Sequence, residues 1–294
     1  MISDQAYDIE ADWTVNHVCN FRCPYCIGSF EPVRGGPTPE LVRRGFDATG
    51  LTWLVHMTGG EPFLLKTFVR LCHLLAERHF VSINTNLSRP LNGFEHLPPD
   101  RVSFVHVGFH SRERKLRMED RFLDVFDRIR RLKKSGFTVF ASQVVGPADF
   151  DAYERDYQLA LMEGVVLKPK IDKGAAFGPG EVGRFLELAA RADGADGRVG
   201  PGLSIDLSSE AQRLHFSVTD FERRLCRSGR KFVTVDPLGN ASRCLAEPLG
   251  NIFDGTLSLN REDRRCNTFP YCKSFCIKYS LPDAALSAVG GTGA

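Results

Sequence analysis

The chain has 294 residues, of which 43% are hydrophobic, 25% charged and 10% aromatic, and its formal net charge is +2. This apolar fraction excludes an intrinsically disordered chain, and the length allows one large domain or two modest ones. The near-neutral charge lacks the basic excess with which nucleic-acid-binding proteins neutralise phosphates. The longest apolar runs have only strand length, and the polar start MISDQAYDIE is unlike a secretory signal. We therefore expect a cytoplasmic protein that binds neither nucleic acid nor membrane.

Strand-length apolar runs alternate with helical patterns from Ile9 to Arg191. The expected strands are 9–18, 53–59, 80–87, 101–110, 137–145 and 164–171. The expected helices are 39–49, 64–79, 114–136, 151–163 and 181–191. This alternation predicts an α/β fold with a parallel sheet of right-handed βαβ units. Six units are too few for a closed eight-stranded barrel, which leaves an open partial barrel or a doubly wound sheet. Functional groups should then lie at the carboxyl ends of the strands.

The composition changes beyond residue 191. A Gly/Asp-rich stretch at 192–202 is typical of a linker, and LSIDL at 203–207 is a short strand candidate. Residues 231–248 have the pattern of a hairpin, with Pro237, Gly239 and Asn240 at its turn. These features predict a separate C-terminal subdomain, and the last residues, SAVGGTGA, are expected to fray.

The nine cysteines fall into two groups, with one cysteine between them. The first group is Cys19, Cys23 and Cys26, and the second is Cys226, Cys244, Cys266, Cys272 and Cys276. A disulfide framework suits a small secreted chain, whereas clustered thiols in a large chain without an export signal favour metal binding. Cys72 follows Phe68 and Leu71 on the apolar face of an expected helix, so we expect an inert core cysteine.

The first cysteine group follows the first expected strand with the spacing C-x₃-C-x₂-C. Three thiolates on a short loop can hold three irons of a 4Fe-4S cluster and leave the fourth iron open. A zinc site completed by His17 is the alternative. The motif resembles that of the radical S-adenosylmethionine (radical SAM) superfamily, including Tyr25 before the third cysteine and Asn20 after the first. A second motif of that family, Thr58-Gly59-Gly60-Glu61-Pro62, ends the second expected strand.

This resemblance implies a fold, two cofactors and a reaction. The fold is a partial (β/α)6 TIM-like barrel, and the cofactors are the 4Fe-4S cluster and S-adenosylmethionine (SAM). In the family, an electron from the cluster cleaves SAM to a 5′-deoxyadenosyl radical, which abstracts a hydrogen atom from the substrate. The resemblance also implies the cofactor-binding residues. The backbone of Gly59 and Gly60 together with Glu61 would bind the methionyl amino group, Tyr25 would lie near the adenine, and Asn84, His110 and Gln143 fall near positions that contact SAM.

Alternation along the strands predicts a polar face that opposes an apolar one. The polar positions are His56, Thr58, Ser82, Asn84, Asn86, His106, His110, Ser142 or Gln143, Lys168 and Lys170. Such a face on buried strands predicts a functional lumen, although a structural hydrogen-bonded network is the alternative. Two buried ammonium groups require anions. We therefore hypothesise that Lys168 or Lys170 binds a carboxylate or phosphate of the substrate.

The second cysteine group resembles the SPASM extension, or its shortened form twitch, which carries auxiliary iron–sulfur clusters in the radical SAM superfamily. The full pattern has a further cysteine where this chain has Asp263, and another beyond Cys276. Five cysteines suffice for one auxiliary 4Fe-4S cluster. The resemblance implies Cys226, Cys244 and Cys276 as its ligands, with Cys266 or Cys272 as the fourth. A zinc site made from four of the five is the alternative. The resemblance divides the chain into a barrel at 1–200, an auxiliary-cluster domain at 201–284 and a disordered tail at 285–294.

Together these features predict a radical SAM enzyme of a biosynthetic pathway. We expect a small polar substrate of the sugar, aminocyclitol or nucleoside type, with the auxiliary cluster assisting oxidation or radical quenching. Modification of a ribosomally made peptide is the alternative, although the first cluster cysteine at residue 19 leaves no room for an N-terminal leader-binding domain. A flavodoxin or ferredoxin is the expected electron donor, and the basic helix 114–134 is a candidate for its docking.

Overall fold

The computed structural model describes residues 6–26, 28–196, 212, 224–243, 247–265 and 279–281. Its main sheet has the strand order β10-β9-β8-β1-β2-β3-β4-β5-β6. The strands β1 to β6 are all parallel, and each pairs with the next one along the chain. They span Ile9–Asn16 (β1), Trp53–Gly59 (β2), Phe80–Thr85 (β3), Val102–Gly108 (β4), Val139–Val145 (β5) and Leu167–Ile171 (β6).

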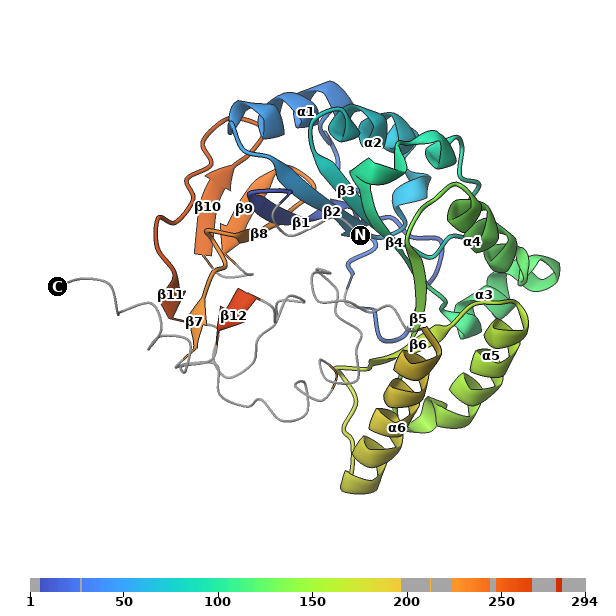
Figure 1. Ribbon diagram of the computed structural model, residues 1–294. Helices are drawn as coiled ribbons and strands as arrows, with labels where there is room; N and C mark the ends of the chain where they lie inside the picture. Colours follow the sequence, from blue (N-terminus) through green and yellow to red (C-terminus); the bar gives the residue numbers. More distant parts are fainter. Residues whose placement is uncertain are drawn as a thin grey trace.

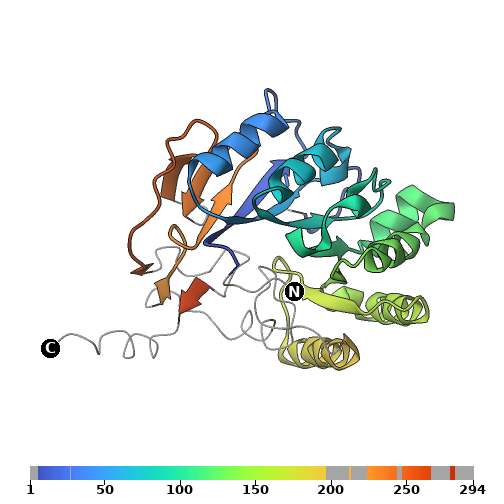
Figure 2. The same cartoon turned by 45° about the horizontal axis from the view of Figure 1, so that its top comes forward.

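The helices follow the strands in alternation. They span Pro39–Ala48 (α1), Phe68–Ala76 (α2), Ser111–Met118 (α3), Asp124–Lys134 (α4), Phe150–Met162 (α5) and Pro179–Asp196 (α6). Short 3₁₀ turns cover Pro62–Leu64 (η1), Phe94–His96 (η2), Pro99–Arg101 (η3), Glu119–Arg121 (η4) and Pro147–Asp149 (η5). The sheet is curved, with helices along its outer side (Figure 1), and Figure 2 shows α1 and α2 lying over that outer face.

The hydrophobic core lies between the curved sheet and the helices. Alternate residues of β1, from Ile9 to Val15, are buried and apolar, and they belong to one cluster with the apolar faces of α2 and α4. Cys72 on α2 is fully buried in this cluster, which confirms it as a core cysteine. The opposite residues of β1 are polar, and they line the inner side of the curve. The expected parallel βα alternation is therefore confirmed.

Three expected element boundaries are wrong, each for a local reason. The expected helix 114–136 is split into α3, η4 and α4, because Glu119 has a positive φ of 27° and a ψ of −102°, outside the helical region. The expected helix 64–79 begins only at Phe68, since Leu65 is extended. The expected linker 192–202 is helical as far as Asp196, and Ala192 is fully buried in the core. The strand candidate 203–207 lies outside the described residues.

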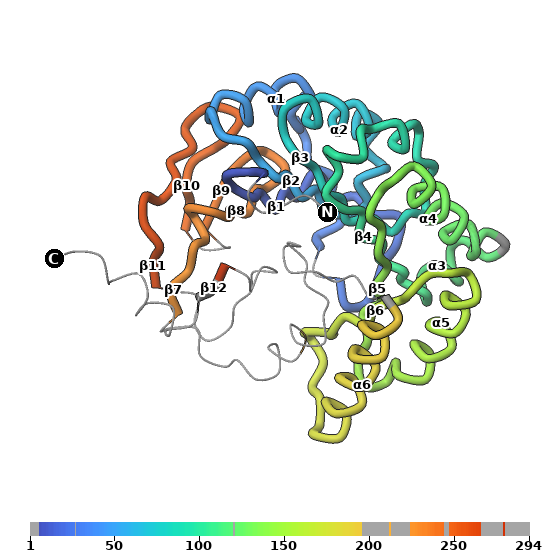
Figure 3. Tube along the Cα trace, in the orientation of Figure 1, coloured from blue at the N-terminus to red at the C-terminus, as the bar shows by residue number. Residues whose placement is uncertain are grey.

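The C-terminal strands extend the main sheet past β1. Residues Phe232–Val235 (β8) pair in parallel with β1, and Asn240–Arg243 (β9) and Glu247–Asn251 (β10) follow in antiparallel order. The predicted hairpin at 231–248 is thus confirmed as β8 and β9. The trace in Figure 3 brings these strands beside β1, where the indole of Trp13 donates a hydrogen bond to the carbonyl of Asp236. The strands β8, β9 and β10 of the expected C-terminal subdomain therefore share a sheet and a core with the βα part.

A second, three-stranded sheet lies next to this extension. It pairs Leu225–Cys226 (β7) with Arg264–Arg265 (β11) on one side and Ser280–Leu281 (β12) on the other. Among the helices of the described residues, none combines the length and the apolar character that a bilayer crossing requires.

Candidate active site

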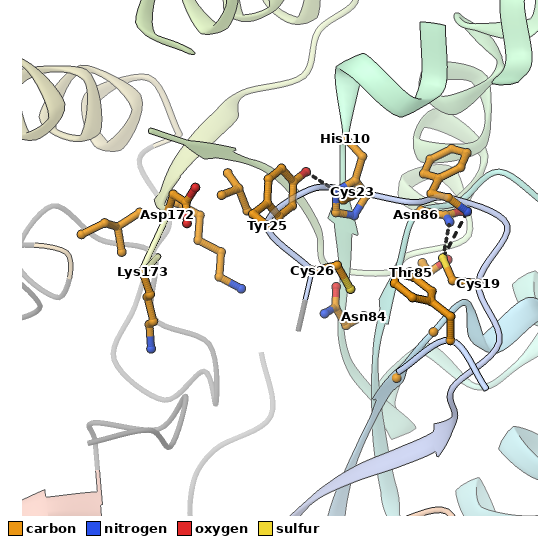
Figure 4. A pocket seen from close by; sticks show the side chains of 17 residues that line it. Cys19, Cys23, Tyr25, Cys26, Asn84, Thr85, Asn86, His110, Asp172 and Lys173 are labelled. Carbon is orange, nitrogen blue, oxygen red and sulfur yellow. Dashed lines mark hydrogen bonds between the residues drawn. The ribbon is translucent and has the colours of Figure 1, made fainter. Parts of the chain in front are cut away.

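A pocket of about 250 Å³ opens at the carboxyl ends of the parallel strands. The residues expected to bind the cluster or SAM that line it are Cys19, Cys23, Tyr25, Cys26, Gly59, Gly60, Asn84 and His110. Figure 4 shows the cysteine side chains on one side of the pocket, with Asp172 and Lys173, which follow β6, on the other. The fold thus brings together two motifs that stand well apart in the sequence.

The cysteine loop, residues 19–26, is a compact turn whose sulfur atoms receive backbone hydrogen bonds. The Cys26 N–H donates to the Cys23 carbonyl at 3.0 Å, and this closes the turn. The Phe21 N–H donates to the Cys19 sulfur and the Gly28 N–H to the Cys26 sulfur, each at 3.4 Å. Burial raises the pKa of the Cys19 thiol and raises that of Cys23 to about 11. Such thiols ionise when a metal binds them, and N–H···S bonds are typical of iron–sulfur ligands. The loop therefore fits a 4Fe-4S cluster.

Two glycines of the Gly-Gly-Glu-Pro motif are required by a close approach of two chain segments. The Gly60 N–H donates to the Asn16 carbonyl at 2.9 Å, and the Glu61 N–H donates to the Val18 carbonyl at 2.8 Å. A Cβ atom on Gly60 would lie 2.0 Å from the Val18 oxygen, and one on Gly59, whose φ is 130°, would lie 2.2 Å from the Asn16 oxygen. The glycines therefore let the motif pair with the segment that leads into Cys19.

The Glu61 side chain differs from its expected placement. It is fully buried and does not line the pocket. Its carboxylate accepts hydrogen bonds from the Thr85 hydroxyl at 2.7 Å, the Asn86 N–H at 2.7 Å and the Phe63 N–H at 3.1 Å. Burial raises the pKa of this carboxyl even though these donors oppose the change. The carboxylate thus connects β2 to the turn after β3, and the glycine backbone is the part of the motif that reaches the pocket.

Tyr25 and His110 form a hydrogen-bonded pair at the rim of the cysteine loop. The Tyr25 hydroxyl and His110 Nδ1 share a hydrogen bond of 2.7 Å, and the two rings lie nearly parallel with centroids 6.0 Å apart. His110 has a left-handed backbone conformation with φ 44°, uncommon for a residue other than glycine. Burial lowers the pKa of His110 to about 3, so the ring is neutral near pH 7. A neutral aromatic pair of this kind can cover a flat ligand ring.

Helix α3 supports the cysteine loop from outside. The Arg22 N–H donates to the Glu113 carboxylate at 2.9 Å, and Arg117 holds the same carboxylate at 2.8 Å. The fully buried Arg114 lies under the Phe21 ring, 5.6 Å from its centroid. Burial lowers the pKa of Arg114 to about 10, so the guanidinium remains charged near pH 7. No local feature of the sequence marks these supporting residues, since the cysteine loop and α3 are distant along the chain.

The inner face of the sheet carries the expected polar side chains below the pocket. His56 Nδ1 lies 2.8 Å from the Ser82 hydroxyl, and His106 Nε2 lies 2.7 Å from the Ser142 hydroxyl. Ser142 is therefore the inward residue of β5. Gln143 points to the opposite side, where its amide donates to Asp156 of α5 at 3.1 Å, and it does not line the pocket. The expected contact of Gln143 with SAM does not agree with this placement, which follows from the alternation of β5.

The two lysines of β6 have different surroundings. Lys168 is buried and forms an ion pair with Asp193 of α6 at 3.0 Å, whereas Lys170 lines the pocket together with Lys173. Burial and the nearby Lys173 lower the pKa of Lys170 to about 8, and the Asp12 carboxylate opposes this change. Lys170 is therefore the β6 lysine that lines the pocket, and Lys173 is a second basic residue there that the strand pattern did not reveal.

The two zinc sites considered as alternatives to iron–sulfur clusters involve different parts of the chain. The described residues include the N-terminal cysteine group but only Cys226 of the C-terminal group. Among those residues, no three thiol, imidazole or carboxylate groups converge on one ion position. The zinc site of Cys19, Cys23, Cys26 and His17 stays an untested alternative to the cluster. Cys226 is buried on β7. Its expected partners Cys244, Cys266, Cys272 and Cys276 lie outside the described residues.

Comparisons with known proteins agree with this geometry. The GTP 3′,8-cyclase of Vibrio cholerae is 37% identical over 71 residues, which are 22% of this chain and 21% of the relative. The chain thus spans about a fifth of the length of such curated relatives. The solved structure of anSMEcpe with bound AdoMet superposes with a TM-score of 0.60 at 16% identity, over 94% of this chain and 91% of that one. SuiB of Streptococcus suis, bound to its precursor peptide SuiA, superposes with a TM-score of 0.55 at 13% identity, over 97% and 67%.

The family model described as the radical SAM superfamily matches residues 13–160, about half of the chain. This match covers the cysteine loop, the Gly-Gly-Glu-Pro motif and the strands β2 to β5, whereas β6 lies beyond it. The chain belongs to the radical SAM superfamily.

Proposed function

We propose that this protein reductively cleaves SAM and abstracts a hydrogen atom from a small polar substrate in a biosynthetic pathway. The observation that carries the proposal is that Cys19, Cys23, Cys26, Gly59 and Gly60 line one pocket, which continues to Lys170. When bound, the cluster supplies the electron that cleaves the sulfonium bond of SAM, and the resulting 5′-deoxyadenosyl radical takes the hydrogen atom. The curved sheet would then serve as the partial TIM-like barrel of the family.

The chain's own residues have separate tasks in this reaction. The three cysteine thiolates would hold the cluster, and the backbone of Gly59 and Gly60 would hold the methionyl part of SAM. The Tyr25–His110 pair would cover the adenine, since its rings are neutral and nearly parallel. Asn84 lines the pocket beside them and offers a carboxamide to the cofactor.

The β6 side of the pocket favours an anionic substrate. Lys170 and Lys173 line it, with Asp172 between them along the chain. Two ammonium groups attract a carboxylate or a phosphate, and Asp172 can accept hydrogen bonds from hydroxyl or amino groups. A sugar, aminocyclitol or nucleoside derivative with an acidic group has this combination.

We also propose one auxiliary 4Fe-4S cluster that assists oxidation or radical quenching. Segments that flank four C-terminal cysteines approach one another. Arg265, before Cys266, pairs with Leu225, beside Cys226. The Arg243 guanidinium, before Cys244, donates to the Arg265 carbonyl at 2.8 Å. Tyr279, three residues after Cys276, accepts a hydrogen bond from the Arg227 N–H at 2.9 Å. These contacts favour a shared site for Cys226, Cys244 and Cys276, with Cys266 or Cys272 as the fourth ligand.

Iron content tests the auxiliary cluster. Anaerobically reconstituted wild-type protein should contain about eight irons per chain, and Cys226→Ser should retain about four together with SAM cleavage. If wild-type protein contained four irons and one zinc per chain, we would conclude that the C-terminal cysteines bind zinc and not an auxiliary cluster.

Formation of 5′-deoxyadenosine from SAM, with dithionite as the electron source, tests the main proposal. Reconstituted protein should form it slowly alone and faster with a substrate. Transfer of deuterium from a labelled substrate into 5′-deoxyadenosine would identify the substrate, and no cleavage by protein with its full iron content would exclude the enzyme. A flavodoxin or ferredoxin should replace dithionite, and the basic segment 114–134 is the candidate surface for its docking.

Peptide modification is the second candidate, because two structural relatives carry peptides in their solved forms. They are anSMEcpe with the Kp18Cys peptide and SuiB with its precursor SuiA. A ribosomally made peptide as substrate would place deuterium in 5′-deoxyadenosine from a labelled peptide residue, whereas the favoured function predicts transfer only from the small molecule.

A further inference from the structure

Asn86 lies between the cysteine loop and the Gly-Gly-Glu-Pro motif. It follows β3 directly, is 4% exposed and lines the pocket. Its carboxamide nitrogen lies 3.8 Å from the Cys19 sulfur and 3.1 Å from the Asn20 side-chain oxygen, as the dashed lines in Figure 4 illustrate for Cys19. Among the described residues outside the cysteine loop, Asn86 is thus the one whose side chain donates a hydrogen bond to a cysteine of that loop.

The orientation of the carboxamide is fixed by its oxygen. The Asn86 Oδ1 accepts a hydrogen bond from the Ser88 N–H at 2.9 Å. Because this oxygen is occupied, the NH₂ group faces the cysteine loop, and its two hydrogens match two acceptors, the Asn20 oxygen and the Cys19 sulfur. The contact with sulfur is therefore an N–H···S hydrogen bond with the amide as donor.

The backbone of Asn86 is held from both sides. Its N–H donates to the Glu61 carboxylate at 2.7 Å, and its carbonyl accepts a hydrogen bond from the buried Arg114 guanidinium. The next residue, Leu87, has a left-handed φ of 52°, and its N–H donates to the Thr85 hydroxyl at 2.9 Å. A strained residue persists only where its surroundings fix it. The turn therefore presents the carboxamide in one place.

We propose that Asn86 is a positioning residue that holds the Cys19 thiolate for the 4Fe-4S cluster and raises the reduction potential of that cluster through its N–H···S bond. This inference rests on the proposed cluster at Cys19, Cys23 and Cys26. Reduction adds a negative charge to the cluster, and a hydrogen-bond donor on a ligand sulfur stabilises that charge. The donors of Phe21 and Gly28 belong to the backbone, so the Asn86 carboxamide is a contact to these sulfurs that a substitution can remove.

Two variants separate the carboxamide from the rest of the turn. Asn86→Asp keeps the size and removes the donor, and Asn86→Ala removes the side chain but keeps the backbone contacts with Glu61 and Arg114. The exposed Asn92→Asp makes the same charge change at a residue that does not line the pocket and serves as the control. The readouts are iron content, the thermal unfolding midpoint of the apoprotein and the cluster midpoint potential from titration followed by electron paramagnetic resonance without SAM. The signal of the N-terminal cluster is the one missing from the Cys19/Cys23/Cys26→Ala variant.

We expect Asn86→Asp to keep the apoprotein fold and to shift the midpoint to a more negative value. At the wild-type midpoint, its ratio of reduced to oxidised cluster should be at least tenfold lower, a shift of about 59 mV for a one-electron couple. Asn86→Ala should shift in the same direction by less, and Asn92→Asp should match the wild type. Loss of iron from a normally folded Asn86 variant would also support the positioning role, since Cys19 would no longer be held.

Full iron content with an unchanged midpoint in both Asn86 variants would overturn the inference. Collapse of the apoprotein in both would overturn it as well, because Asn86 would then be only a structural residue. If the proposed function were wrong, the wild-type protein itself would show no cluster signal in electron paramagnetic resonance. Failure of the proposed function can therefore be distinguished from failure of the inference on Asn86.

Discussion

The cofactor side of the pocket and the inner face of the sheet below the pocket, here called the lumen side, are built in different ways. On the cofactor side, the cysteine loop, the Gly-Gly-Glu-Pro motif and the turn after β3 hold one another through hydrogen bonds, as at Glu61. On the lumen side, some polar side chains have atoms that could still form a hydrogen bond. The buried Asp12 Oδ1 and His106 Nδ1 have no hydrogen-bond partner within the part of the chain that the structure describes.

This difference distinguishes polar groups that hydrogen-bond within the protein from polar atoms that are left to bond with a ligand. A buried polar atom without a partner costs roughly 1–3 kcal/mol, so such atoms persist where function retains them. The Glu61 carboxylate on the cofactor side is fully hydrogen-bonded, whereas Asp12 Oδ1 and His106 Nδ1 on the lumen side have no partner among the described residues. Substitutions on the cofactor side should therefore damage the protein, and some lumen substitutions should stabilise it.

The largest effect is expected from the cysteine loop. Cys23→Ala removes a cluster ligand, so 5′-deoxyadenosine formation should fall at least about a thousandfold, and iron content should drop by about four per chain. Liquid chromatography of the SAM reaction and an iron assay measure both. Cys72→Ala is the matched control, because Cys72 lies in the core and should affect only stability. Retained cleavage by Cys23→Ala would remove this cysteine from the ligand set.

The next effect is expected where the two motifs meet. In Gly60→Ala, the new Cβ would lie 2.0 Å from the Val18 carbonyl oxygen, so one of two paired backbones must move. We expect a loss of about 3 kcal/mol or more in the free energy of unfolding, together with weaker SAM binding. Urea unfolding and calorimetry with SAM measure these quantities.

Gly183→Ala in α6 provides the contrast to Gly60→Ala. A Cβ atom added to Gly183 would meet no atom of the described residues within 4 Å outside its own helix, so this substitution should stabilise the protein by about 0.5–1 kcal/mol. Equal effects of the two glycine substitutions would show that the approach at Gly60 is not tight.

Much of this architecture could be predicted from the sequence because its signals are local. Each parallel strand is an apolar run next to a helical pattern, and the two motifs lie at strand ends. The two lysines of β6 show the limit of such signals. Alternation gives Lys168 and Lys170 the same face, but Asp193, which belongs to the following helix α6, pairs with Lys168. Long-range partners of this kind have no local pattern.

The same limit explains the other differences at the site. The Glu61 carboxylate binds Thr85 and Asn86 at the end of the next strand instead of the pocket. The pairing of β8 with β1 joins a segment near the C-terminus to the first strand of the chain. The sequence does not indicate whether Ser142 or Gln143 is the inward residue of β5. The hydrogen bond between His106 and Ser142 shows that it is Ser142.

An intermediate effect is expected from the lumen carboxylate. Burial raises the pKa of Asp12 from 3.8 to about 7, even though Lys170 lowers it. Between these two pH values the folded state binds more protons than the unfolded state, so wild-type stability should fall as pH rises. Asp12→Asn removes this penalty and should stabilise the protein by on the order of 2 kcal/mol at pH 8, but by little at pH 4. Urea unfolding at both pH values tests this, and destabilisation at pH 8 would contradict it.

The smallest effect concerns the charge that faces the ligand. Sulfate is a suitable probe because its own charge is constant above pH 6. Lys170→Gln should weaken sulfate binding about tenfold, roughly 1.4 kcal/mol, while the exposed Lys133→Gln should not change it. Because the pKa of Lys170 is lowered to about 8, its cation is lost as pH rises through that value. Wild-type affinity should therefore decline above pH 8, and Lys170→Arg, which stays protonated, should remove most of this decline. Calorimetric titrations at pH 7 and pH 9 measure both effects, and a pH profile that is identical in wild type and Lys170→Arg would assign the anion site to another cation, with Lys173 as the first candidate.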